Sequence, residues 1–128
     1  MVVAGLVLAA IGGLLHVFIF YLESIAWTGE RARSTFGTSP QQAQETRELA
    51  FNQGFYNLFL AIAVFLGIVL FTAGQEVAGA TLVFTGAGSM ALAALVLLVS
   101  SPAKARAALT QGVIPALGVL LLALGLGL

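Results

Sequence analysis

The chain has 128 residues, of which 60% are hydrophobic and 8% are charged, and its formal net charge is zero. Soluble proteins carry about 25% charged residues, so this composition predicts an integral membrane protein surrounded by the lipid bilayer. The balanced charge gives no basic surface for nucleic acid, and the absence of cysteine excludes disulfides and thiolate metal sites. With His16 as the only histidine, one chain cannot assemble a zinc site from nitrogen and sulfur ligands, so neither a metal nor another cofactor is expected.

The first apolar segment predicts a transmembrane helix over residues 2–27. A helix of this length crosses about 30 Å of hydrocarbon at about 1.5 Å per residue. No Lys or Arg precedes the apolar run, and Glu23 stands where a cleavage region would lie. We therefore expect a retained helix and not a signal peptide. Gly5, Ala9 and Gly13 recur at every fourth residue, which favours close packing against another helix.

Residues 28–48 are polar and are expected to lie outside the membrane. Six of the ten charged residues fall in this segment, and residues 28–33 are predicted to form a short charged turn. Ser39 followed by Pro40 and Gln42 is typical of a helix start, with Ser39 as the N-cap and Gln42 completing a capping box. The second predicted helix therefore covers residues 40–73 and enters the bilayer near Leu49.

Two further helices complete the predicted fold. Residues 77–99 form the third, which carries only small or hydroxylated interruptions, and residues 102–128 form the fourth. Ala108, Gly112 and Ala116 give the fourth helix a second ridge of small residues, and Pro115 removes the backbone donor to the carbonyl of Gln111. The sequence thus predicts an all-α, four-transmembrane-helix bundle in a single domain, residues 1–128.

Basic residues predict how this bundle is oriented. All of them belong to the two connections on one side of the bundle: Arg31, Arg33, Arg47, Lys104 and Arg106. By the positive-inside rule this side is cytoplasmic. We therefore expect a multi-pass protein of the inner (plasma) membrane with both termini outside.

Polar side chains inside the predicted spans form the candidate site. Counted inward from the cytoplasmic interface, Glu23, Asn52, Gln53 and Gln111 lie about 5–6 Å deep, Tyr56 and Asn57 about 11–12 Å, and His16 roughly 16 Å. Lipid cannot complete their hydrogen bonds, so they either bond to neighbouring helices or face a wet cavity. The first alternative makes them interhelical contacts, with His16 as a core histidine. The second makes them a cytoplasm-facing pocket, with His16 at its base and available as a proton carrier.

Three functions remain open at this point. The first, which suits the site best, is binding or transport of a small molecule or proton through the cytoplasm-facing pocket, and a pore would need a homo-oligomer because four helices enclose little space. The second is a membrane-embedded enzyme that uses His16 and Glu23 as acid and base on a lipophilic substrate. About 10 Å along the helix axis separates those two residues, which weakens a concerted pair. The third is an accessory or structural subunit whose polar face meets a partner protein.

Two motifs resemble those of a known family. H-x-x-I-F-x-L-E covers residues 16–23 and N-Q-G-x-Y-N covers residues 52–57, with Trp27, Phe36-Gly37 and Gln111-Gly112 as further matches. Over essentially its whole length the chain resembles the small bacterial membrane proteins catalogued as domain of unknown function thirteen-hundred-and-four. The resemblance implies a compact four-helix membrane protein, and it implies no particular reaction.

Overall fold

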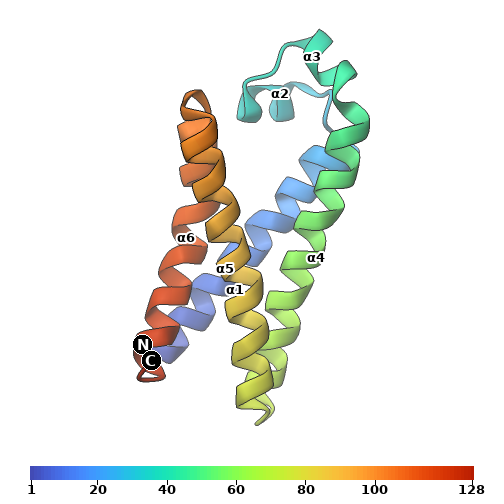
Figure 1. The fold of residues 1–128 in the computed structure, drawn as a ribbon. Helices are drawn as coiled ribbons and strands as arrows, with labels where there is room; N and C mark the ends of the chain where they lie inside the picture. Colours follow the sequence, from blue (N-terminus) through green and yellow to red (C-terminus); the bar gives the residue numbers. More distant parts are fainter.

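Four long helices dominate the structure, a computed structural model that describes residues 1–128 and contains no strands (Figure 1). Their apolar spans are Val2–Ile25, Arg47–Thr72, Glu76–Ser100 and Pro102–Gly125, with 24 to 26 residues each. At about 1.5 Å per residue each span exceeds the 30 Å of a bilayer core. The predicted all-α architecture with four membrane-crossing helices is confirmed, and the chain is a multi-pass membrane protein.

The four helices form a ring. Helix α1 (Val2–Phe20) packs against α4 (Arg47–Thr72) on one side and against α6 (Ala105–Gly125) on the other, and α5 (Glu76–Ser100) closes the ring between α4 and α6. Both termini and the turn between α4 and α5 lie at one end (Figure 1). The short helices α2 (Glu30–Phe36) and α3 (Pro40–Glu45) lie at the other end. This is the end that carries the basic residues.

Glycines set the distance between helices where the ring is tightest. A Cβ atom built at Gly5 of α1 would lie 2.5 Å from the backbone nitrogen of Leu122 in α6, and one at Gly118 would lie 2.9 Å from that of Ala9. Between lipid-embedded helices the hydrophobic effect supplies little attraction, so backbone contact at small residues supplies the van der Waals packing. The half of the bundle near the termini is therefore closely packed.

The helix bounds differ from the predicted ones in the polar connection. Residues predicted as a turn form α2, which Gly37 ends in the left-handed conformation at φ 69°. The predicted capping box is present: the Ser39 hydroxyl accepts from Gln42 N at 3.1 Å, and Gln42 Oε1 accepts from Ser39 N at 2.9 Å. The helix that it starts is not continuous, because Thr46, with φ −104° and ψ 7°, separates α3 from α4.

Trp27 explains this interruption. Its indole Nε1 donates to Thr46 Oγ1 at 3.0 Å, and the Thr46 hydroxyl donates to the carbonyl of Gln42 at 2.7 Å. The Trp27 ring also lies 5.3 Å, centroid to centroid, from Phe36 at the end of α2. One side chain thus joins both short helices to the end of the first span. Trp27 lies beyond the helix, since the first span ends at Ile25 and not at residue 27.

At the other two helices the bounds shift by a few residues. Helix α5 covers one residue more than predicted at each end. The fourth span begins with a single 3-10 turn, η2 (Pro102–Lys104), before α6, and it ends at Gly125. Pro115 leaves α6 unbroken and packs against α1, where its Cγ would lie 2.9 Å from a Cβ built at Gly12.

Candidate functional site

A π-helical turn, η1 (Tyr21–Ile25), ends the first span and positions Glu23. Here the amide of Ala26 donates to the carbonyl of Tyr21, five residues earlier, at 2.9 Å. A π-turn places an extra residue in one helical turn and is frequent at functional sites. The regular 3.6-residue period assumed from the sequence therefore fails in the segment that carries the carboxylate.

Gly54 allows η1 and α4 to touch. A Cβ atom at this position would overlap the hydroxyl of Ser24, and that hydroxyl donates to the carbonyl of Phe51 at 2.7 Å. The glycine in the N-Q-G-x-Y-N motif is thus required by close helix contact. The contact sets the register of η1 against α4 and brings Glu23 to the next turn of α4.

Glu23 and Asn57 form a buried pair across this contact. Asn57 Nδ2 donates to Glu23 Oε1, and the same amide group donates to the carbonyl of Gln53 at 3.3 Å. Both side chains are buried. A carboxyl group inside a span costs about 2.5–3.5 kcal/mol unless it is partnered, so the amide donor offsets part of the cost of burying Glu23. Among the predicted polar residues, these two bond to each other between helices.

The other polar side chains of the motif face out of the bundle: Asn52, Gln53 and Tyr56. All three are exposed, and Tyr56 retains 62% of its accessible surface. Together with Glu23 they line an open groove of about 740 Å³ beside η1, whose other lining residues are Trp27, Thr46, Leu49 and Ala50. Four of the seven predicted site residues therefore share one shallow surface feature.

His16 lies apart from this groove. Its side chain is 2% exposed, and Nδ1 donates to the carbonyl of Gly12, one turn earlier in α1, at 2.8 Å. It lines neither the groove nor the second polar cavity described next. His16 therefore lies outside both of these features, and its Nδ1 bonds to its own helix.

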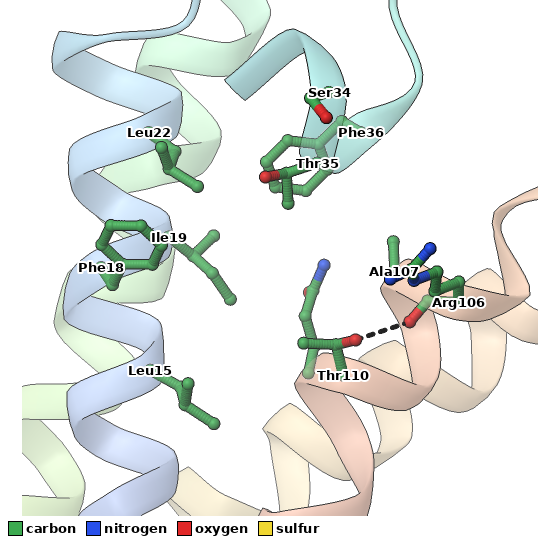
Figure 2. Close-up of a pocket in the computed structure, with 11 residues that line it drawn as sticks. Leu15, Phe18, Ile19, Leu22, Ser34, Thr35, Phe36, Arg106, Ala107 and Thr110 are labelled. Carbon is green, nitrogen blue, oxygen red and sulfur yellow. Dashed lines mark hydrogen bonds between the residues drawn. The ribbon is translucent and has the colours of Figure 1, made fainter. Parts of the chain in front are cut away.

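Gln111 belongs to a second, more enclosed cavity, which we call the α1–α2–α6 cavity (Figure 2). Its volume is about 370 Å³. Its lining residues are Leu15, Phe18 and Ile19 from α1, Leu22 from η1, Ser34, Thr35 and Phe36 from α2, and Arg106, Ala107, Thr110 and Gln111 from α6. Of these, sequence reasoning selected Gln111 alone.

The walls of this cavity differ in character. The α1 wall is apolar, whereas α6 contributes an arginine, a hydroxyl and an amide (Figure 2). The Thr110 hydroxyl already donates to the carbonyl of Arg106, and the Thr35 hydroxyl to that of Arg31, both at 2.8 Å. The Ser34, Arg106 and Gln111 side chains remain as donors for a bound molecule. Arg106 is the one charged residue in the lining.

Little in the sequence points to this cavity, because residues 28–33 are predicted as a turn and Arg106 as a basic residue of a connection. Neither segment points to a site until α2 is placed against α1 and α6. No group of three or more His, Asp or Glu side chains lies close enough to hold a metal ion.

Comparisons with known proteins identify a family and assign no activity. No curated protein and no solved structure matches the chain. The model of one family matches residues 8–123, which is 116 of the 128 residues (123 − 8 + 1 = 116). By this match, the chain belongs to the family described as "Protein of unknown function (DUF1304)".

Proposed function

We propose that this protein binds a small amphipathic molecule with an anionic polar group in the α1–α2–α6 cavity. The observation that supports this most is the contrast between the apolar α1 wall and the polar α6 wall of one enclosed space. Ligand pockets are mostly apolar, contain a few placed polar groups and measure about 300–1,000 Å³. The volume of about 370 Å³ suits a molecule of modest size.

Arg106 is the basis for an anionic ligand. A guanidinium carries its charge at all physiological pH values and donates to carboxylate or phosphate oxygens in bidentate geometry. No carboxyl group lines this cavity, and Glu23 lines the other groove. The Gln111 amide can donate a further hydrogen bond. An alkyl chain would then lie along Leu15, Ile19 and Leu22.

The cavity is proposed to open toward the cytoplasm. All five basic residues lie at the end of the bundle that holds α2 and α3, whereas the opposite end carries Glu76 and none of them. The positive-inside rule then places the connections in the cytoplasm and both termini outside, in the inner (plasma) membrane. A ligand would enter from the cytoplasm or from the inner leaflet.

Binding is better supported than transport or catalysis. Toward the far end of the bundle, the close contacts of Gly5 with Leu122 and of Gly118 with Ala9 pack α1 directly against α6, and the cavity lies at the basic end. His16 and Glu23 make no contact with each other that would support acid–base catalysis. His16 bonds to the carbonyl of Gly12, and Glu23 accepts from Asn57.

The test uses the single tryptophan, Trp27, as a reporter, because its ring packs on Phe36 in the cavity wall. The chain is placed in lipid nanodiscs and titrated with an alkyl phosphate, an alkyl carboxylate and an alcohol of equal chain length. We expect the anionic probes to bind at least about tenfold more tightly than the alcohol, since a hydrogen bond to a charged group contributes about 1.5–3 kcal/mol.

Arg106→Gln should abolish this preference. Lys104→Gln is the matched control, because Lys104 is a basic residue in the same connection and does not line the cavity. Ala107→Leu should weaken all three probes by filling the cavity. Equal binding of the alcohol and the anions by the unmodified chain, or equal effects of the two glutamine variants, would refute the proposal.

A further inference from the structure

The outward face of α4 carries a regular stripe of side chains, which we call the α4 seam. Its members follow one another at spacings of three and four residues in alternation: Leu49, Asn52, Tyr56, Phe59, Ala63 and Leu66. This is the spacing of the a and d positions of a coiled coil, where each side chain meets a facing helix. Five of the six members are exposed, Leu49 by 73% and Leu66 by 49%, and Ala63 is half-buried.

The seam is separate from the contacts that α4 makes within the bundle. Residues Ala50, Gly54, Asn57, Ala61, Val64 and Gly67 are buried against the other helices and lie on the opposite side of α4. Spacings of three and four residues occur on every face of an α-helix, so they show only that one facing helix could contact the whole seam. The side chains of the seam decide the occupant.

Lipid is a poor occupant because two members of the seam are polar. The Asn52 amide and the Tyr56 phenol lie within the apolar span, both are exposed, and neither makes a hydrogen bond within the chain. Hydrocarbon offers such groups no partner, whereas an amide facing another helix gains an interhelical hydrogen bond. Side chains on a helix lean toward its N-terminus, so the Tyr56 hydroxyl points toward the level of Asn52.

We propose that the α4 seam packs against the same seam of a second copy, in a parallel dimer with its two-fold axis along the membrane normal. In a parallel pair each seam residue faces its equivalent, so the surface must complement itself. An asparagine amide does so, because it carries both donors and an acceptor. Any other register would set the two Asn52 amides against apolar side chains, where they would lack a hydrogen-bond partner.

The positions that flank the seam fit the same arrangement. In a parallel coiled coil, the g position, just before a, on one helix lies beside the following e position, just after d, on the other helix. Glu48 and Gln53 hold these two positions, and both are exposed. The Gln53 amide can donate to the Glu48 carboxylate of the second copy across the seam. The exposed amides of the N-Q-G-x-Y-N motif thus find their partners in this dimer.

Single cysteines test the proposal directly, because the natural chain has none and any disulfide must join two copies. Phe59→Cys and Leu66→Cys lie in the seam, and Ile62→Cys and Val69→Cys are controls, one turn along but exposed on a different side of α4. Disulfides form where Cα atoms approach within about 7 Å. Oxidation in native membranes should give dimers from the seam variants and few from the controls. Equal yields from both pairs, or products only of other masses, would overturn the proposal.

Asn52→Leu tests the role of the amide. An interhelical hydrogen bond in a membrane contributes about 0.6–2 kcal/mol, so the dimer dissociation constant in detergent should rise about three- to thirtyfold. Gln44→Leu, an exposed amide on α3, is the control and should leave the constant unchanged. A dissociation constant that Asn52→Leu does not alter would contradict the assignment of Asn52 to the interface.

Discussion

At the scale of single residues, the same kind of amide has opposite surroundings on α4. Asn57 faces inward and donates to Glu23, whereas Asn52 faces outward and makes no hydrogen bond within the chain. At roughly 100° per residue the four polar side chains of the motif cover an arc of about 140°, which is wide enough to reach both faces of the helix. Interhelical contact and exposure are therefore both correct descriptions, each for a different residue.

Replacing Asn57 should cost stability. Asn57→Leu leaves the buried Glu23 carboxyl without its amide donor, and an orphaned buried polar group costs about 1–3 kcal/mol. We expect the melting temperature in detergent to fall by several degrees. Gln44→Leu in α3 is the control, because that side chain is exposed, bonds to nothing within the chain and lies outside the α4 seam. Similar losses for both variants would show that the Glu23–Asn57 pair is not a stabilising contact.

At the scale of helices, close approach at glycine is what holds α1 against α6. The sequence identified the small-residue ridge of α1, and the structure gives its members different neighbours. Gly5 meets the backbone of Leu122, whereas Gly13 meets the Phe65 ring of α4, with a built Cβ 2.8 Å from its Cζ. A ring at the end of a side chain can move aside, and a backbone cannot. The two positions should therefore differ in their tolerance of larger residues.

Gly5→Ala should separate α1 from α6. The added Cβ lies 2.5 Å from the Leu122 nitrogen, so the helices must move apart, and overpacking of this kind costs about 1–3 kcal/mol. Gly88→Ala in α5 is the matched control, since nothing lies within 4 Å of its built Cβ. Thermal unfolding should show a lower midpoint for the first variant and an equal or higher midpoint for the second. A stable Gly5→Ala protein would mean that this contact is not tight.

At the scale of the whole molecule, the two ends of the bundle differ in how closely they are packed. The end near the termini is closely packed, and the basic end holds the α1–α2–α6 cavity, the groove beside η1 and both short helices. If the basic residues set the orientation, both polar features lie at the cytoplasmic side.

Two glutamines test this orientation. Gln41→Cys in α3 and Gln75→Cys in the turn between α4 and α5 are both exposed and lie at opposite ends of the bundle. In intact cells a membrane-impermeant thiol reagent should label the second and not the first, and permeabilised cells should label both. The reverse pattern would invert the topology and remove the cytoplasmic opening proposed for the cavity.

The sequence by itself determined the membrane class, the four helices and the gathering of basic residues at one end. These properties are sums over long segments, so local errors such as the missed helix α2 or the break at Thr46 do not alter them. The capping box at Ser39 was equally predictable because all its bonds join residues three apart.

Only the tertiary structure decided which polar residues meet. The predicted site assumed regular helices, and the π-turn at residues 21–25 changed the direction of the residues that follow it. Whether a side chain on α4 faces a neighbour depends on where η1 and α1 lie around it, and the close contact of Gly54 with Ser24 sets that position. Such contacts join residues far apart in the chain, so no local pattern encodes them. The α1–α2–α6 cavity could not be predicted for the same reason, because its lining residues come from segments that are far apart in the chain.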